Sequence, residues 1–203
     1  MLSETPRAGA AGAVIPIRAF ALGKARLAAA LDAGERAVLG RRWAEQVVHA
    51  AGPMPVVVVS SDPEVRVWAA ELALDTVDDP GTLDGAAAAG RERLRMHGCT
   101  RVVVAHADLP RAHNLPRLAR DGSRPIVTVV PCHRDDGSPV LSVPAASDFR
   151  FSYGPGSFRR HAAEARRLGL GLRVVRDRDL AFDVDLPDDL LALNATLQPS
   201  GTP

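Results

Sequence analysis

The chain of 203 residues has few aromatic side chains, few cysteines and almost no net charge. Its two cysteines, Cys99 and Cys132, are not spaced as metal ligands, which excludes a zinc module and a disulfide framework and predicts two buried free thiols. A formal net charge of +1 gives no general attraction for nucleic acid or for an anionic membrane. No apolar run reaches the roughly 18 residues of a membrane span, and the N-terminus lacks the pattern of a signal peptide. The expected location is therefore the cytoplasm.

The composition that remains is that of an ordinary globular protein, with 46% hydrophobic and 24% charged residues. A chain of this length predicts one domain. We expect residues 1–12, rich in alanine and glycine, to be a disordered lead-in, residues 13–197 to form the domain, and residues 198–203 to be a frayed tail.

Apolar runs and helical patterns alternate along the chain, which predicts an α/β fold with a mostly parallel sheet. The interruption between Pro131 and Gly154 indicates an inserted hairpin. The expected strands are Val14–Ile17, Pro55–Ser60, Leu74–Val77, Arg101–Ala107, Pro125–Pro131, Val140–Val143 and Leu172–Arg176. The expected helices are Glu35–Ala51, one starting at Pro63 behind an Asp62 cap, Asp84–His97, Arg111–Arg120, Phe158–Leu168 and Pro187–Leu197.

Carboxylates gather at two predicted strand ends. Asp183 and Asp185 are two residues apart, so in a strand they would share a face at a spacing of about 7 Å. Asp108 ends another apolar strand. Three such acids would suit a magnesium site for phosphoryl or nucleotidyl transfer. The alternative is that Asp185 and its neighbours only cap and charge the first turn of a helix that begins at Pro187, and that Asp108 caps the next helix.

Two loops could bind anions. Lys24 and Arg26 follow the first strand, where open α/β sheets bind ligands, although the segment is not a Walker A motif and could be a solvated basic turn. The Gly154–Ser157 loop precedes a helix whose free N–H groups suit phosphate or carboxylate, or Ser157 is simply its N-cap. His161, one turn later, would extend that anion site or face solvent. His106 is more simply a packed, hydrogen-bonded histidine than a base.

These segments, taken in order, resemble one known family, the 2-phospho-L-lactate guanylyltransferases of coenzyme F420 biosynthesis. The resemblance runs from about Val14 to Leu193 and covers nearly the whole chain. Its motifs are Lys24-Ala25-Arg26-Leu27, Asp108-Leu109-Pro110, Gly137-Ser138 with Val140-Leu141, Gly154-Pro155-Gly156-Ser157 with His161, and Asp183-Val184-Asp185-Leu186-Pro187-Asp188-Asp189-Leu190.

The resemblance implies a Rossmann-like three-layer α/β/α sandwich of the nucleotide-diphospho-sugar transferase type. It implies Mg²⁺-dependent transfer of GMP from GTP to 2-phospho-L-lactate, phosphoenolpyruvate or 3-phospho-D-glycerate, with release of pyrophosphate, and the next enzyme of the coenzyme F420 pathway as a partner. The implied roles are Asp108, Asp183 and Asp185 on magnesium, Lys24 and Arg26 on the triphosphate, Leu83 and Asp84 near the nucleotide, and Ser138, Gly154 and Ser157 on the phospho-acid.

The chain departs from the family pattern at several positions. Asp84 stands for an asparagine, which replaces an amide with an acceptor-only carboxylate that could still accept from guanine N1–H and N2–H₂. Ser138 stands for a threonine, Pro139 for a residue with a backbone donor, and Arg18 for a lysine.

Two other interpretations stay open at this stage. A different nucleotidyltransferase of the same fold would act on a sugar phosphate or a molybdopterin, but such enzymes usually carry a glycine-rich loop after the first strand, where only Gly23 stands. A non-catalytic nucleotide-binding domain would not need all three carboxylates. The sequence does not predict an oligomeric state.

Overall fold

The computed structural model describes residues 10–20, 27–28, 30–120, 125–184, 189–191 and 193. Within them the strands are β1 (Ala11–Pro16), β2 (Val56–Val59), β3 (Asp75–Val77), β4 (Arg101–Ala105), β5 (Ile126–Val130), β6 (Val140–Pro144) and β7 (Gly171–Val174). The helices are α1 (Ala33–Ala51), α2 (Pro63–Glu71), α3 (Leu83–Met96) and α4 (Ser157–Arg167), with the 3₁₀ helix η2 (Leu115–Ala119).

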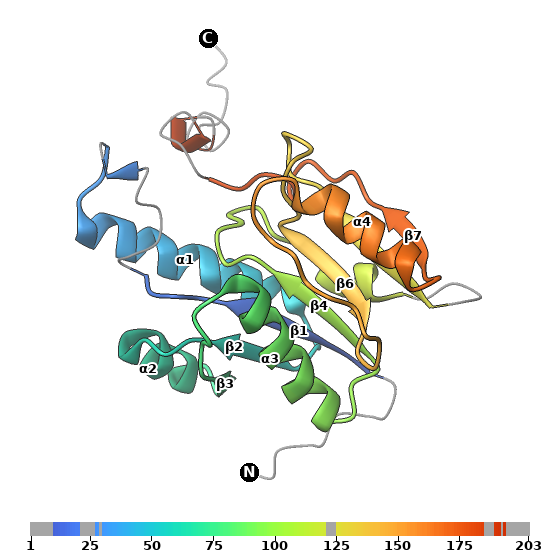
Figure 1. Cartoon of the computed structure of the whole chain (residues 1–203). Helices are drawn as coiled ribbons and strands as arrows, with labels where there is room; N and C mark the ends of the chain where they lie inside the picture. The colour runs from blue at the N-terminus through green and yellow to red at the C-terminus, as the bar shows by residue number, and fades with distance from the viewer. Residues whose placement is uncertain are drawn as a thin grey trace.

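The strands form one seven-stranded sheet in the order β3-β2-β1-β4-β6-β5-β7 (Figure 1). The β1, β2, β3 and β4 strands pair in parallel, as do β5 and β7. Only β6 runs against its neighbours, β4 and β5. The predicted mostly parallel sheet and the inserted β5–β6 hairpin are therefore both confirmed.

Helices cover both faces of the sheet, because side chains alternate between the two faces along each strand. Ala13 and Ile15 of β1 belong to a core that includes residues of α1, α2 and η2. Val14 points to the other face, into a core shared with α3 and α4. The fold is thus the expected three-layer α/β/α sandwich.

Local signals set where the helices begin and how closely they pack. Asp32 and Glu35 form the capping box of α1, and Asp62 caps α2 ahead of Pro63. A Cβ built at Gly90 would lie 2.4 Å from Cγ1 of Val14, so only glycine lets α3 approach β1 this closely.

Three predicted elements differ from the structure. The helix expected over Arg111–Arg120 shrinks to η2, because Asn114 adopts a left-handed conformation and Pro116 follows at once. The α3 helix begins one residue earlier than Asp84, behind a Thr82 cap. Asp183 lies in irregular backbone rather than at a strand end.

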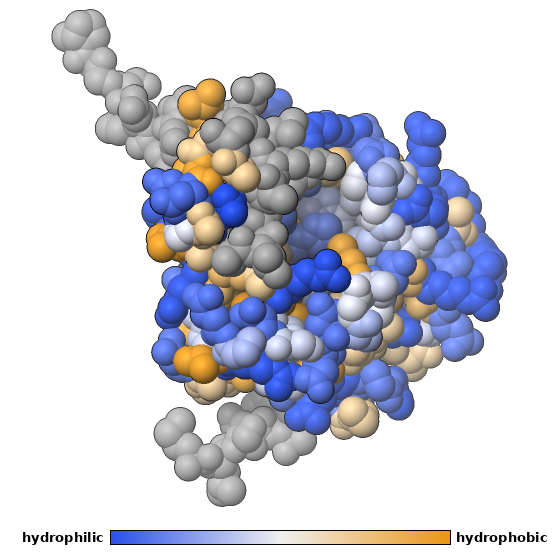
Figure 2. All heavy atoms as spheres, turned by 60° about the vertical axis from the view of Figure 1, so that its left-hand side comes forward, coloured by the Kyte–Doolittle hydropathy of each residue, from blue (hydrophilic) through white to orange (hydrophobic). Residues whose placement is uncertain are grey.

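Among the described residues, no helix is both long and apolar enough to cross a membrane. Hydrophilic residues predominate on the face drawn in Figure 2, and hydrophobic ones are scattered among them. Cys99 and Cys132 are buried free thiols, as predicted.

Candidate functional site

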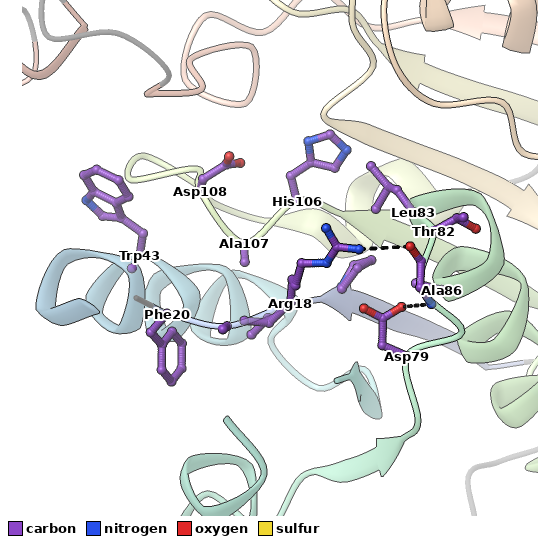
Figure 3. Close-up of a pocket in the computed structure, with 15 residues that line it drawn as sticks. Arg18, Phe20, Trp43, Asp79, Thr82, Leu83, Ala86, His106, Ala107 and Asp108 are labelled. Atoms are coloured by element: carbon purple, nitrogen blue, oxygen red, sulfur yellow. Dashed lines mark hydrogen bonds between the residues drawn. The ribbon is translucent and has the colours of Figure 1, made fainter. Parts of the chain in front are cut away.

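A cavity of about 450 Å³ opens at the carboxyl ends of β1 and β4. The chain passes from β1 through β2 to β3 on one side and then returns to β4 on the other, so this is the point where the strand order reverses. Open α/β sheets bind ligands at such a point. The loop after β1, the start of α3, the turn after β4 and one side chain of α1, Trp43, line the cavity (Figure 3).

The loop after β3 forms a polar wall of this cavity around Gly81. The guanidinium of Arg18 donates to the Gly81 carbonyl at 3.0 Å, and the Gly81 N–H donates to Oδ1 of Asp79 at 2.9 Å (Figure 3). The hydroxyl of Ser61 also accepts from the Asp79 N–H at 3.0 Å, which fixes the loop to the end of β2. The Asp79 carboxylate is therefore held in place before any ligand binds.

The turn after β4 brings His106 and Asp108 to the cavity. The His106 N–H donates to the Pro139 carbonyl at 2.9 Å, which ties this turn to the start of β6. Its ring lies 5.4 Å from that of Tyr153, centroid to centroid. Among the described residues, the buried Nε2 of His106 makes no hydrogen bond. The prediction of a packed histidine is confirmed, but that of a hydrogen-bonded ring is not, and the ring lines the site.

The segment that carries Asp183 packs beside the Asp108 turn. The guanidinium of Arg111 lies 4.4 Å from the centroid of the Phe182 ring. On the other side of Asp183, Val184 is fully buried in one cluster with Trp43, which also lines the cavity. The fold thus brings the Asp108 turn and the Asp183 segment to the same end of the cavity.

Of the predicted magnesium ligands, Asp108 and Asp183 are described and Asp185 is not. The side chain of Asp183 is 18% exposed and its Oδ1 lies 3.4 Å from Nδ1 of His133. Of the two, only Asp108 lines the cavity, and a carboxylate there fits the ligand preference of Mg²⁺. The predicted triphosphate residues, Lys24 and Arg26, also lie outside the described residues.

One other group of possible metal ligands is present in the described part of the chain. His113, Asp177 and Asp179 place ligand atoms within 4.8 Å of one another. However, Arg117 and His113 already pair with the Asp177 carboxylate. A cation there would have to displace a guanidinium, so this group is explained by its internal ion pairs.

Two predicted acceptor residues, Ser138 and Ser157, meet in the interior, where together with His161 they form what we call the serine–histidine cluster. The Ser138 hydroxyl lies 2.8 Å from that of Ser157 and 2.8 Å from Nδ1 of His161. Nε2 of His161 accepts from the Ser152 N–H at 2.9 Å, so Nδ1 carries the proton and donates to Ser138. All three members of the cluster are at most 1% exposed.

Burial sets the ionisation of this cluster. It lowers the pKa of His161 to about 4, so the ring is neutral at physiological pH. Burial also raises the pKa of Tyr153, whose ring packs edge-on against that of His161 at 4.9 Å. The rings of His106, Tyr153 and His161 therefore run in sequence from the cavity wall to the cluster. His161 neither faces solvent nor carries charge.

The N-terminus of α4 is already occupied by an acid. Gly156, with φ of 76°, is the N-cap, so Ser157 is not the cap that the alternative interpretation assigned to it. The Gly156 N–H donates to Oδ1 of Asp136 at 2.7 Å, and the Ser157 N–H donates to the Gly154 carbonyl at 3.0 Å. An acceptor anion would have to compete with Asp136 for this helix end.

The two residues expected near the nucleotide separate in the structure. Leu83 lines the cavity, with 37% of its surface exposed. Asp84 lies off it: its Oδ1 accepts from the Tyr153 N–H at 2.6 Å, and the residue lines a second recess. The position of Asp84 thus links α3 to the segment that leads into the Gly154 loop.

The sequence alone did not identify three residues of the site. They are Asp79, Asp136 and Arg18, the last as a hydrogen-bond donor at the cavity. The signal for Asp79 was present, since Asp79-Pro80-Gly81 is a turn between a strand and a helix. For Asp136 there was no such signal: Asp136-Gly137-Ser138 has the composition of a simple turn, and nothing in the sequence links it to the start of α4.

Known proteins resemble this chain in both sequence and fold. The phosphoenolpyruvate guanylyltransferase of Rubrobacter xylanophilus is 35% identical over 91% of this chain and 93% of its own. The phosphoenolpyruvate guanylyltransferase of Sphaerobacter thermophilus is 32% identical over 88% of this chain and 89% of its own. A structure from Desulfovibrio desulfuricans, named as a nucleotide-diphospho-sugar transferase, matches 95% of this chain and 90% of its own with a TM-score of 0.76 at 16% identity. The structure of a nucleotidyl transferase from Methanothermobacter matches 92% of this chain and 97% of its own, with a TM-score of 0.70 at 17% identity.

The fold is therefore that of the nucleotide-diphospho-sugar transferases. The family model described as "Guanylyl transferase CofC like" matches residues 11–198, which includes every segment that builds the cavity and the serine–histidine cluster. The chain belongs to this family of guanylyltransferases.

Proposed function

We propose that this protein transfers GMP from GTP to a small phosphorylated acid, with phosphoenolpyruvate as the first candidate and 2-phospho-L-lactate and 3-phospho-D-glycerate as the others. The observation that carries the proposal is the cavity at the strand-order reversal, with Asp108 on its edge and the Asp183 segment packed beside it. The names of the relatives supply the candidate acceptor.

In the proposed reaction, a phosphate oxygen of the acceptor attacks the α-phosphorus of GTP. One P–O bond forms, the bond between the α-phosphorus and the bridging oxygen breaks, and its electron pair leaves with pyrophosphate. No covalent enzyme intermediate is needed, because the nucleophile is already an anion. The protein's part is to position two anions and offset their charge.

Asp108, Asp183 and Asp185 would hold Mg²⁺, which when bound neutralises charge on the reacting phosphates. Lys24 and Arg26 would offset charge on the leaving pyrophosphate. His106 also lines the cavity, but its Nε2 is buried and makes no hydrogen bond among the described residues, so we assign it no contact with the substrates.

The acceptor would bind on the α4 side, at Ser138, Gly154 and Ser157. The serine–histidine cluster is buried behind the rings of Tyr153 and His106, and only His106 of these residues lines the cavity. Its hydroxyls bond to each other, and the start of α4 is held by Asp136. Binding would therefore exchange internal hydrogen bonds for bonds to the acceptor's phosphate and carboxylate.

The test is pyrophosphate release from GTP in the presence of Mg²⁺ and each of the three acids in turn. Because the guanylylated product is labile, the reaction is also run with the next enzyme of coenzyme F420 biosynthesis to trap it. We expect one acid to support turnover, with no turnover after chelation of Mg²⁺. The proposal fails if no acid supports release above that of GTP alone.

A further inference from the structure

The polar wall around Gly81 contains a hydrogen-bond donor, Arg18, and an acceptor, Asp79, each of which can make further hydrogen bonds. In the described part of the chain, the Arg18 guanidinium makes a single hydrogen bond, to the Gly81 carbonyl, and no ion pair. Guanidinium carries five N–H donors, so four remain. Asp79 uses Oδ1 for the Gly81 N–H, and its Oδ2 makes no hydrogen bond among the described residues.

The surface next to this wall is apolar. Leu83 and Ala86 of α3 line the cavity beside Gly81, and Leu83 is one of the few large apolar side chains with substantial exposure. In Figure 3, Asp79 and Asp108 lie on different sides of Arg18. The cavity thus has an acidic end at Asp108 and, away from it, an apolar surface edged by a donor and an acceptor.

A purine base has flat apolar faces and a polar edge, so it fits the second end. We infer that Asp79 and Arg18 select guanine, with Asp79 accepting from N1–H and N2–H₂ and Arg18 donating to O6. This inference rests on the proposed function, which it deepens by assigning base selection to named residues. It moves that role from Asp84, whose carboxylate is bonded to the Tyr153 N–H away from the cavity.

Asp79 and Arg18 would discriminate between bases because a wrong base leaves their hydrogen-bonding groups unpaired. Adenine presents an acceptor at N1 and has no donor at C2, so it cannot pair with the carboxylate in the same pose. Hypoxanthine keeps N1–H and O6 but lacks the amino group. Xanthine carries a carbonyl at C2, which would face the Asp79 carboxylate directly. Sites built to bond a donor reject analogues that lack it.

The decisive variant is Asp79→Asn, measured with GTP and with xanthosine triphosphate. The amide oxygen can still accept from the Gly81 N–H, so the loop keeps its turn, while the NH₂ group replaces Oδ2 and donates to the xanthine C2 carbonyl. We expect kcat/KM for GTP to fall about 10- to 100-fold and that for xanthosine triphosphate to rise, so that the preference inverts.

Asp78→Asn is the matched control. Asp78 is the preceding residue, but its exposed side chain pairs with Arg66 and does not line the cavity. It should leave the ratio of the two nucleotides unchanged. A second variant, Arg18→Met, should weaken GTP, inosine triphosphate and xanthosine triphosphate by similar factors, because all three carry the C6 carbonyl.

The inference is overturned if Asp79→Asn keeps the wild-type ratio of GTP to xanthosine triphosphate. Its failure is distinguishable from failure of the proposed function. Wild-type protein that releases no pyrophosphate with any acceptor contradicts the function. Calorimetric binding of the two nucleotides to wild type and Asp79→Asn still decides base selection, because it requires no turnover.

Discussion

The cavity and the serine–histidine cluster differ in whether their hydrogen-bonding groups are already paired within the protein. At the cavity, Arg18 and Asp79 carry hydrogen-bonding groups that the described residues do not use. In the cluster, Ser138 and His161 already use their hydrogen-bonding groups in bonds to other groups of the protein. The first region is ready for a ligand as it stands, whereas the second must give up internal bonds to take one.

This difference assigns the two substrates different requirements. A nucleotide would enter a preformed site with little rearrangement. An acceptor anion would have to replace Asp136 at α4 and share the Ser138 and Ser157 hydroxyls. If the proposed function holds, the charge and hydrogen bonds of the acceptor side would set acceptor affinity, and changes there should leave nucleotide binding almost untouched.

The largest expected effect is on the cavity side. Asp108→Asn should lower kcat by at least about 100-fold, because it removes a charge that would act on the reacting phosphates. Turnover is followed by pyrophosphate release, and thermal unfolding shows whether the fold is intact. Asp148→Asn, at an exposed position, is the control. Near-normal turnover of the Asp108 variant would remove this residue from the site.

The next effect is on stability in the cluster. His161 has a folded-state pKa of about 4, below the value of 6.5 in an unfolded chain. As pH falls from 6.5 to 4, the unfolded state takes up a proton that the folded state does not. The free energy of unfolding should thus fall by about 3 kcal/mol over this range, and be fully regained above pH 6.5.

Denaturant titrations at several pH values measure this effect. His161→Gln should flatten that part of the pH profile, whereas His49→Gln, which changes an exposed histidine, should not. Identical profiles for wild type and His161→Gln would show that the ring does not titrate in this way.

Ser157→Ala tests whether the cluster also serves the acceptor. Loss of the bond to Ser138 should cost about 1 kcal/mol of stability, and loss of a bond to a charged acceptor should raise its KM by about 10-fold or more. KM for GTP should stay nearly constant. Ser147→Ala removes a 2.7 Å bond to the Pro144 carbonyl outside the site, so it should affect stability alone. A stability loss without a change in acceptor KM would leave Ser157 as a purely structural residue.

The smallest effect concerns the acid at α4. Asp136→Asn keeps an oxygen for the Gly156 N–H but removes the negative charge that competes with an acceptor. Acceptor affinity should rise by roughly 2- to 5-fold, the equivalent of 0.3–1 kcal/mol at a helix end. Asp135→Asn breaks an exposed ion pair with Arg176 and serves as the control. An unchanged or lower affinity in the Asp136 variant would argue that the anion binds elsewhere.

Local sequence signals predicted most of the fold. The β-branched run Val56–Val59 and the caps at Asp32 and Asp62 act within a few residues, and the structure confirms all of them. The helix expected at Arg111–Arg120 failed because a left-handed residue, Asn114, interrupts a pattern that periodicity alone does not resolve.

The site was less predictable, because its contacts join distant segments. Asp108 and Leu83, which the motifs predicted at a magnesium ion and near the nucleotide, both line the cavity, and their roles there stay predictions. The bond between Asp84 and the Tyr153 N–H, and that between Asp136 and the Gly156 N–H, link residues 69 and 20 positions apart. No pattern in a single sequence reports such pairs, so the roles of the two acids become visible only in the structure.

The most direct test of the contrast between the two regions is calorimetric titration of phosphoenolpyruvate, with Mg²⁺, into the protein with and without a GTP analogue whose α–β bridge is a methylene. The analogue should bind the free protein by itself. Phosphoenolpyruvate should bind the analogue-loaded protein more tightly than the free one, because contacts with the bound triphosphate and its Mg²⁺ would offset the internal hydrogen bonds that the acceptor side must give up. Equal or tighter binding of phosphoenolpyruvate to the free protein would contradict this account.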